Sequence, residues 1–152
     1  MKSKQLGILI VVFLIFDSSA FARRSRNSDN VVRVHMQRDR NHWMVGIDCR
    51  ISGADRSHIC VIDSGASHTM ISDKIVKPEG PLIDVTTANG VIRAHARHVS
   101  FTITDSLHLD SLALVQSQMT PPDIEILLGQ DVLRQFRSVI FDYEKEEVEF
   151  HR

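Results

Sequence analysis

The sequence predicts an all-β domain, a barrel or a sandwich, on three observations. Short segments in which apolar and polar residues alternate recur along the chain, and turn-forming residues separate them. Only one segment, in the second half, has the apolar spacing of a convincing helix. The strand-like segments are too short and too closely spaced for the helix-linked units of a parallel sheet. With 152 residues, the chain is expected to form one domain.

The first 22 residues have the layout of a secretory signal peptide. Lys2 and Lys4 give a basic start, an apolar run covers residues 6–16, and Ala20 and Ala22 form an A-x-A pattern. The run is shorter than the roughly 20 residues that a membrane-spanning helix needs. We therefore expect cleavage after Ala22 and export of the mature chain.

Three arginines directly after the proposed cut, Arg23, Arg24 and Arg26, leave an alternative open. Positive charge at this place favours the cytoplasmic side of a membrane, so the competing interpretation is an uncleaved anchor or a buried N-terminal helix. Residues 23–31 are expected to be a flexible lead-in, and the folded domain is expected to span residues 32–152.

Alternation with period two predicts the first strands. It covers residues 32–36 and, after a turn, residues 43–51. A second turn at residues 52–55 leads into residues 58–62, which are more continuously apolar. This segment is therefore expected to be a strand buried on both faces.

The rest of the chain predicts further strands and two helices. A short helix capped by Ser72 is expected over residues 72–76, and a longer helix over residues 130–136, where Val132, Leu133 and Phe136 share one face. Asn89-Gly90 is the strongest hairpin signal in the chain. The expected strands are residues 82–87, 91–103, 107–115, 124–128, 140–143 and 148–150.

An acid follows the apolar strand of residues 58–62 at once. Burying the Asp63 carboxylate at the end of such a strand costs free energy unless the carboxylate is paired or hydrogen-bonded. Gly65 allows a sharp turn that brings backbone N–H groups to the carboxylate, and the Ser64 hydroxyl can hold the loop by hydrogen bonding. By itself, the tripeptide is equally compatible with an ordinary strand-ending turn in which Asp63 binds its own backbone.

Three motifs, in order, resemble the retropepsins, the aspartic proteases of retroviral type. Residues 62–67, Ile-Asp-Ser-Gly-Ala-Ser, resemble the active-site motif, a hydrophobic residue followed by Asp-Thr/Ser-Gly-Ala/Ser. Residues 87–91, Thr-Ala-Asn-Gly-Val, resemble the flap hairpin of exported bacterial members. Residues 126–129, Ile-Leu-Leu-Gly, are similar to the second signature that precedes a helix. The resemblance runs from about residue 32 to residue 150. It departs at Ser64, where many members have Thr, and in the absence of an aromatic residue near Gly90.

The resemblance implies a closed barrel with a flap hairpin and one short C-terminal helix, in a periplasmic or secreted bacterial protein. It also implies roles. Asp63 would be catalytic, and its loop would be supported by Ser64, Gly65, Ala66 and Ser67. A flap that closes over an extended peptide would be formed by Ala88, Asn89, Gly90 and Val91. Beneath the loop would pack Leu127, Leu128 and Gly129, and the terminal strands, including residues 148–150, would contribute to a dimer interface.

The chemistry of such a protease predicts a homodimer. Peptide hydrolysis of this kind needs one ionised and one protonated carboxylate at the same water, and such a pair shares a proton. The chain contains one such motif and is short for two lobes, so the second Asp63 must come from a second copy related by a two-fold axis. A polypeptide substrate is expected, without metal or cofactor. The net charge of −1 offers no field for nucleic acid or an anionic membrane, and stable membrane insertion is expected only if the N-terminal segment stays uncleaved.

The two cysteines predict a cross-strand disulfide. If Ala54 and Asp55 are the two turn residues, Cys49 lies directly opposite Cys60, with Cβ atoms about 4.5–5.5 Å apart. An oxidising compartment would permit the bond. The alternative is two small buried apolar side chains.

Other functional classes are weaker interpretations. His95 and His98 would point to opposite faces of a strand, which argues against a metal site. Ser67-His68 are adjacent on an extended chain and cannot readily form a nucleophile and its base, which argues against a serine hydrolase. Two hypotheses remain beside the protease. One is a catalytically silent module of the same fold that binds peptides or serves as a dimeric assembly piece. The other is a metal- or cofactor-dependent hydrolase.

Overall fold

The structure, a computed structural model, describes residues 31–38, 44–87, 90–117, 119 and 123–152. In this part the regular secondary structure is almost all strand, as predicted, with the single short helix α1 (Gln130–Leu133). The strands are β1 (Val31–His35), β2 (Gln37–Arg38), β3 (Val45–Ile51), β4 (Ser57–Ile62), β5 (Met70–Ser72), β6 (Leu82–Thr87), β7 (Gly90–Thr104), β8 (Leu107–Gln116), β9 (Ile126–Leu128), β10 (Ser138–Asp142) and β11 (Glu147–His151).

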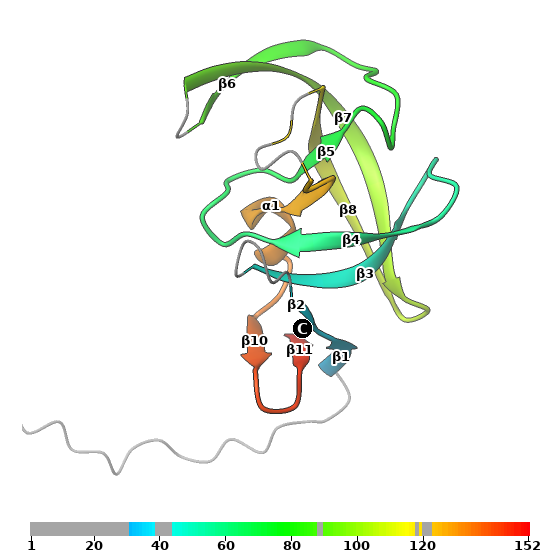
Figure 1. Ribbon diagram of the computed structural model, residues 1–152, viewed down its shortest axis with the longest axis vertical. Helices are drawn as coiled ribbons and strands as arrows, with labels where there is room; N and C mark the ends of the chain where they lie inside the picture. Colours follow the sequence, from blue (N-terminus) through cyan, green and yellow to red (C-terminus); the bar gives the residue numbers. More distant parts are fainter. Residues whose placement is uncertain (1–30, 39–43, 88–89, 118, 120–122) are drawn as a thin grey trace, which may run out of the picture.

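Six strands close into a barrel, which confirms the expected architecture. They follow one another as β3-β4-β9-β5-β8-β7, and β7 pairs again with β3 to close the ring. Strand β2 extends the ladder beyond β3, and β6 extends it beyond β7. A separate sheet of order β1-β11-β10 lies at one end of the barrel, and the β6–β7 hairpin lies at the other (Figure 1). The barrel leaves no free edge among its six strands.

The barrel interior and the small sheet share one apolar core. Inward residues of β3 alternate with outward ones, so that Ile47, Cys49 and Ile51 are buried while Asp48 is exposed. Val148 and Phe150 of β11 are fully buried in the same core, and the rings of Phe136 and Phe150 lie 4.8 Å apart. Full burial of such side chains stabilises the fold by about 1.5–3 kcal/mol each. The three-stranded sheet is therefore anchored to the barrel.

Both helix predictions need correction. Residues 73–76 form a turn, because β5 continues to Ser72, whose hydroxyl oxygen accepts the Lys74 N–H at 3.3 Å, and the chain then runs to Pro78. The second helix ends at Leu133 rather than at residue 136. Phe136 leaves the helix to pack in the core, and the chain must already turn there to begin β10 at Ser138.

The prediction for β4 was right in its second half only. Cys60, Val61 and Ile62 are buried, but Ile59 is 44% exposed, because its side chain lines an open surface hollow together with Gly46 and Ile124.

The cysteine register was wrong by two residues, although Cys49 and Cys60 do form a disulfide. Cys49 pairs with His58, and Cys60 pairs with Ile47. The register shifts because the turn is centred on Ser52 and Gly53 rather than on Ala54 and Asp55: the Ala54 N–H donates to the Ile51 carbonyl oxygen at 3.1 Å, and Gly53 has a φ of +86°. The disulfide thus joins diagonal positions, with the Cα atoms 5.9 Å apart, within the range for such a bond.

The predicted signal peptide and residues 23–30 of the lead-in lie outside the described residues, and so do Ala88 and Asn89. Strand β1 begins at Val31, one residue before the predicted start of the domain. No helix in the described ranges is long and apolar enough to cross a membrane.

Candidate active site

Asp63 stands directly after β4, on a tight turn. Its backbone N–H donates to the carbonyl oxygen of Leu128 at 3.0 Å, and its own carbonyl oxygen accepts the N–H of Ala66 at 3.3 Å. The Gly65 N–H donates to Oδ1 of the Asp63 carboxylate at 2.8 Å. The second carboxylate oxygen, Oδ2, has no hydrogen-bond partner among the described residues. One oxygen is therefore fixed by the turn, and the other is available for a ligand.

Gln130, the first residue of α1, ties the Asp63 loop to the helix. Its backbone N–H donates to the carbonyl oxygen of Ala66 at 2.8 Å, and its side-chain Nε2 donates to the carbonyl oxygen of Ser64 at 2.7 Å. The Ser64 side chain is exposed, and its hydroxyl makes no hydrogen bond within the described chain. Ser64 thus holds the loop through its carbonyl group, not through the hydroxyl that the sequence analysis favoured.

A buried polar network lies behind the loop. Thr69 is fully buried; its hydroxyl accepts the Gly129 N–H at 3.1 Å and donates to the Asp131 carboxylate at 2.9 Å. The Ser111 hydroxyl donates to the other oxygen of the same carboxylate. A Cβ atom on Gly129 would lie 2.5 Å from the carbonyl carbon of His68, so no larger residue fits there without a shift of backbone. These contacts fix β9 and α1 against the chain that follows Asp63.

Asp63 faces a cleft of about 500 Å³ that lies between its loop and the β6–β7 hairpin. The hairpin contributes Val85, Thr86, Thr87 and Ile92. The remaining lining residues are Asp63, Gly65, Ala66, Ser67, His68, Met70, Leu114, Gln116, Met119 and Leu127. Half of the fourteen lining residues have apolar side chains, and Asp63 is the only carboxylate among the described lining residues. The cleft can therefore take apolar groups against an acid.

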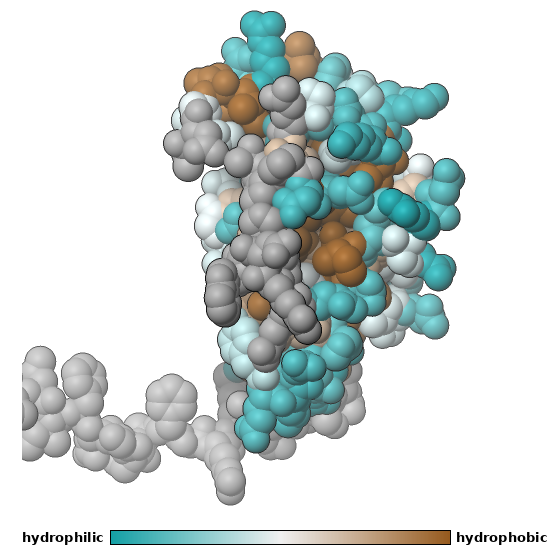
Figure 2. All heavy atoms as spheres, viewed as in Figure 1, coloured by the Kyte–Doolittle hydropathy of each residue, from teal (hydrophilic) through white to brown (hydrophobic). Residues whose placement is uncertain are grey.

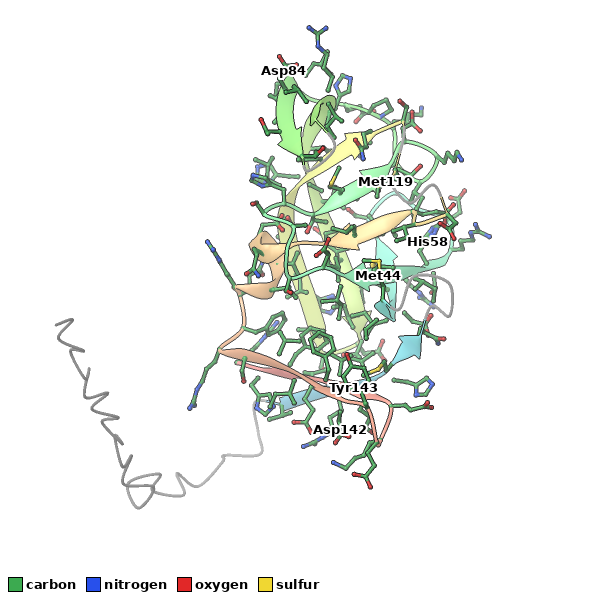
Figure 3. The ribbon with its side chains drawn as sticks, turned by 60° about the vertical axis from the view of Figure 1, so that its left-hand side comes forward. Met44, His58, Asp84, Met119, Asp142 and Tyr143 are labelled. Atoms are coloured by element: carbon green, nitrogen blue, oxygen red, sulfur yellow. A yellow bond between two sulfur atoms is a disulfide. The ribbon has the colours of Figure 1, made fainter. Side chains whose placement is uncertain are left out.

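The β6–β7 hairpin is an exposed ribbon. Thr87 pairs with Gly90, and the Thr87 hydroxyl donates to the Gly90 carbonyl oxygen at 2.9 Å. Leu82, Ile83 and Val91 are among the exposed large apolar residues, and Figure 2 shows apolar surface at this end of the molecule. Figure 3 shows Asp84 of the hairpin at the opposite end from Asp142 and Tyr143.

The comparisons with known proteins concern the fold. No family model and no curated protein matches the sequence. Among solved structures, the chain is similar to a retropepsin-like aspartic protease from Rickettsia conorii, with a TM-score of 0.56 and 19% identity over 79% of this chain and 90% of that chain. The fold is retropepsin-like.

Within this retropepsin-like fold, the first and third predicted motifs lie side by side, and of the described residues of the second motif Thr87 alone lines the cleft. Strand β9 runs parallel to β4, with Val61 beside Leu127 and Ile62 beside Leu128. Leu127 lines the cleft, whereas Leu128 is fully buried in the core, as expected for neighbours in a strand. Of the four predicted flap residues, Gly90 and Val91 are described, and Val91 is largely exposed.

The other candidate residues occupy places apart from the acid. Cys49 and Cys60 lie in the core and do not line the cleft. His95 hydrogen-bonds the Gly80 carbonyl oxygen at 3.0 Å, and no cluster of metal-ligating side chains occurs among the described residues. Ser67 and His68 are exposed at the cleft without a hydrogen bond between them in the described part of the chain.

Sequence patterns missed the residues that support the site from a distance. Thr69 and Asp131 are separated by 62 positions, so no local pattern links them. The sequence predicted a helix that contains Gln130 and Asp131, but the prediction used only the apolar face of that helix and assigned no role to these two polar side chains. The one available signal was that both polar side chains follow Gly129 directly, at the start of the helix.

Proposed function

We propose that this chain is an aspartic endopeptidase that acts as a homodimer, with Asp63 of each copy at one shared water. One observation carries the proposal: Asp63 turns its carboxylate, one oxygen of which has no partner among the residues that the structure describes, into a cleft walled by a hairpin of the retropepsin-like fold. Each chain brings one such acid to the cleft.

The chemistry requires the two carboxylates in different protonation states. Two acids in contact cannot both ionise easily, so one is protonated at working pH. The ionised Asp63 takes a proton from the water, while the protonated Asp63 donates a hydrogen bond to the scissile carbonyl oxygen. The water oxygen then bonds to the carbonyl carbon. The tetrahedral intermediate collapses with cleavage of the C–N bond as the first Asp63 passes the proton it took from the water to the leaving nitrogen, which returns the pair to its starting protonation state.

The shape of the cleft supports a peptide substrate in an extended conformation. Strands β6 and β7 supply one wall and the Asp63 loop supplies the other, so both walls can offer backbone hydrogen bonds. Met70, Leu114 and Leu127 offer apolar contacts to the side chains of the substrate.

Export forms part of the proposal. The N-terminal pattern of basic, apolar and small residues predicts a signal peptide, and the Cys49–Cys60 disulfide supports an oxidising compartment. N-terminal sequencing of protein from the periplasm or the medium should find Arg23 first. An intact Met1 would remove this part of the proposal.

The decisive experiment compares the wild type with Asp63→Asn, which keeps the shape of the side chain but cannot ionise. Both proteins, lacking residues 1–22, are incubated with a mixed peptide library between pH 4 and pH 7, and the products are identified by mass spectrometry. We expect cleavage by the wild type alone, unaffected by a chelator. If a confirmed wild-type dimer cleaves nothing at any pH, the silent binding module becomes the better hypothesis, and loss of activity with the chelator would favour a metal-dependent hydrolase.

A further inference from the structure

We propose that Gln116 is a specificity-determining residue of the cleft, and that its side-chain amide binds the carboxamide of a glutamine or asparagine side chain in the substrate. The inference rests on the proposed function, because it names the class of polypeptide that the Asp63 site would cleave. It gives a role to a polar side chain that belongs to none of the three sequence motifs and does not support the Asp63 loop.

The alternation of strand β8 places the Gln116 side chain in the cleft. Near the end of this strand, Ala113 and Val115 belong to the apolar core, whereas Leu114 and Gln116 line the cleft. Successive side chains of a strand point to opposite faces, so Leu114 and Gln116 share the outer face of the barrel. The backbone is held here, because the Asp73 N–H donates to the Gln116 carbonyl oxygen at 2.9 Å. The amide is therefore presented by a paired strand.

The Gln116 amide is buried but only partly hydrogen-bonded. The residue is 7% exposed, and its Nε2 donates to the Met119 Sδ at 3.3 Å. A thioether sulfur accepts weakly and cannot donate, so this contact fixes the nitrogen, not the oxygen, toward Met119. The Gln116 Oε1 accepts no hydrogen bond from a described residue. Because buried amide atoms are normally hydrogen-bonded, Oε1 is a place where a bound group is expected.

The unpartnered oxygen is open to the cleft. Among the described residues, no side-chain nitrogen or oxygen is both fully enclosed and without a hydrogen-bond partner. Since the Gln116 Oε1 has no described partner, it is not fully enclosed, and the space that Gln116 borders is the cleft of Asp63. A substrate in the cleft can therefore reach this oxygen.

The hydrogen-bonding groups that remain on Gln116 match a second carboxamide. One N–H of Nε2 is used by the Met119 sulfur, which leaves the oxygen and the other N–H. A substrate carboxamide can donate an N–H to the oxygen and accept the remaining N–H with its own oxygen. An ionised carboxylate has no proton to donate to Oε1, and an apolar side chain leaves both groups of Gln116 unpaired. The amide of glutamine or asparagine is therefore the better partner.

The walls beside Gln116 fit the methylene groups of such a side chain. Met70, Leu114, Met119 and Leu127 also line the cleft, and all four are buried or half-buried. Figure 3 shows Met119 between the level of Asp84 in the hairpin and that of Met44. In apolar surroundings, an analogue that leaves polar groups unpaired is strongly disfavoured. We therefore expect discrimination of about tenfold or more.

The two-fold symmetry of the proposed dimer adds a requirement. A second copy that brings its own Asp63 also brings its own Gln116, so the two amides lie on opposite sides of the scissile bond. The preference for an amide side chain should therefore occur at one position before this bond and at one position after it.

A peptide series measures the preference with the wild-type protein. In a peptide that the wild type cleaves, each position near the scissile bond is made Gln, Glu or Met in turn, since these side chains are similar in length. The assay is run at pH 6, where a glutamate side chain is ionised. We expect kcat/KM to be about tenfold higher or more with Gln than with Glu or Met, at one position on each side of the bond. The absence of any position that prefers Gln to Met would overturn the proposal.

A matched pair of substitutions assigns the preference to its residue. Gln116→Met keeps the length of the side chain and removes the amide, whereas Gln135→Met removes an amide that binds backbone carbonyl oxygens outside the cleft. Thermal melts verify that both variants fold, and the wild-type series decides alone if Gln116→Met does not. We expect the ratio of kcat/KM for Gln and Met peptides to approach one in Gln116→Met and to persist in Gln135→Met. A folded Gln116→Met enzyme that retains the wild-type ratio contradicts the assignment.

Binding separates this proposal from the protease itself. Dissociation constants for fluorescently labelled peptides that differ only in Gln or Met are measured with Asp63→Asn by fluorescence anisotropy. Cleavage by the wild type without a preference for Gln in either assay would remove the Gln116 subsite alone. Tighter binding of the Gln peptide, with no cleavage of any peptide by the wild type, would remove the protease alone.

Discussion

The two walls of the cleft are built differently. Behind the Asp63 loop, the fully buried Thr69 hydroxyl and the Gly129 backbone form one connected network with the half-buried Asp131 carboxylate. The opposite wall is a two-stranded ribbon whose cross-strand ion pair, Arg93 with Asp84, joins side chains that are 74% and 64% exposed. Exposed pairs of this kind contribute little, about 0–1 kcal/mol, whereas an unsatisfied buried polar group costs about 1–3 kcal/mol. The wall behind the acid is thus held by buried polar contacts, while the ion pair across the hairpin contributes little to holding the opposite wall.

Two glycine substitutions test this difference with the largest expected effect. Gly129→Ala places a Cβ atom 2.5 Å from the carbonyl carbon of His68, and relief requires backbone movement in the buried wall. We expect a loss of about 3 kcal/mol in the free energy of unfolding, measured by urea denaturation.

Gly90→Ala in the hairpin is the matched control. Its φ is +115°, and a Cβ there would meet no atom within 4 Å. We expect a loss of about 1 kcal/mol, from the backbone conformation alone. Equal losses for the two variants would contradict the contrast between the walls.

A change at Gln130 tests whether the rigid wall positions the acid. Gln130→Glu keeps the side-chain shape but replaces the Nε2 donor that the Ser64 carbonyl oxygen accepts. We expect kcat to fall by about tenfold with KM nearly unchanged, because the Asp63 loop shifts while the substrate contacts remain.

Gln135→Glu is the control for that variant. Gln135 also uses its Nε2 to bind backbone carbonyl oxygens, those of Asp110 and Asp131, but it does not contact the Asp63 loop. Its substitution should lower the melting temperature slightly and leave kcat in place. A kcat loss shared by both variants would show that the loop of Asp63 is not specifically held by Gln130.

The smallest predicted effect is on the stability of the fold at acid pH, and it arises from Glu149 in the small sheet, at the end of the barrel opposite the hairpin. Hydrogen bonding to Arg33, and then to His151, lowers the pKa of Glu149 below its ordinary value of 4.5. The folded state therefore binds fewer protons than the unfolded state in this range, so the stabilisation is present above pH 4.5 and is lost as the pH falls through the lowered pKa.

Thermal melts of the wild type and of Glu149→Gln between pH 2 and pH 7 measure this contribution. The difference between the two proteins should shrink toward low pH. A constant difference across the range would exclude the ionised Glu149 as its source.

The sequence located the acid because its signals are local. The apolar strand, the Asp-Ser-Gly turn and the Leu-Leu-Gly segment are each contained in a few residues, and β4 and β9 do place Asp63 above Leu128. The cysteine register was missed because the turn uses Ser52 and Gly53, where Gly53 has a φ of +86°, instead of the next two residues, Ala54 and Asp55.

The residues that support the site could not be predicted, because their contacts join distant parts of the sequence. Ser111 and Asp131 meet only because β8 and α1 pack together, and Thr69 is an ordinary polar residue until the fold buries it completely. The expected helix over residues 72–76 failed because pairing of β5 with β8 extends to Ser72. Tertiary contacts override local propensity at such positions.

Mixing of subunits tests the central claim most directly. Wild type and Asp63→Asn are combined in equal amounts, equilibrated, and assayed against a cleavable peptide at fixed total concentration. If each active site needs one Asp63 from each of two copies, only wild-type pairs cleave, and activity falls to about a quarter of that of the wild type alone. Activity at about one half would mean that each chain works by itself, and the shared acid pair would be wrong.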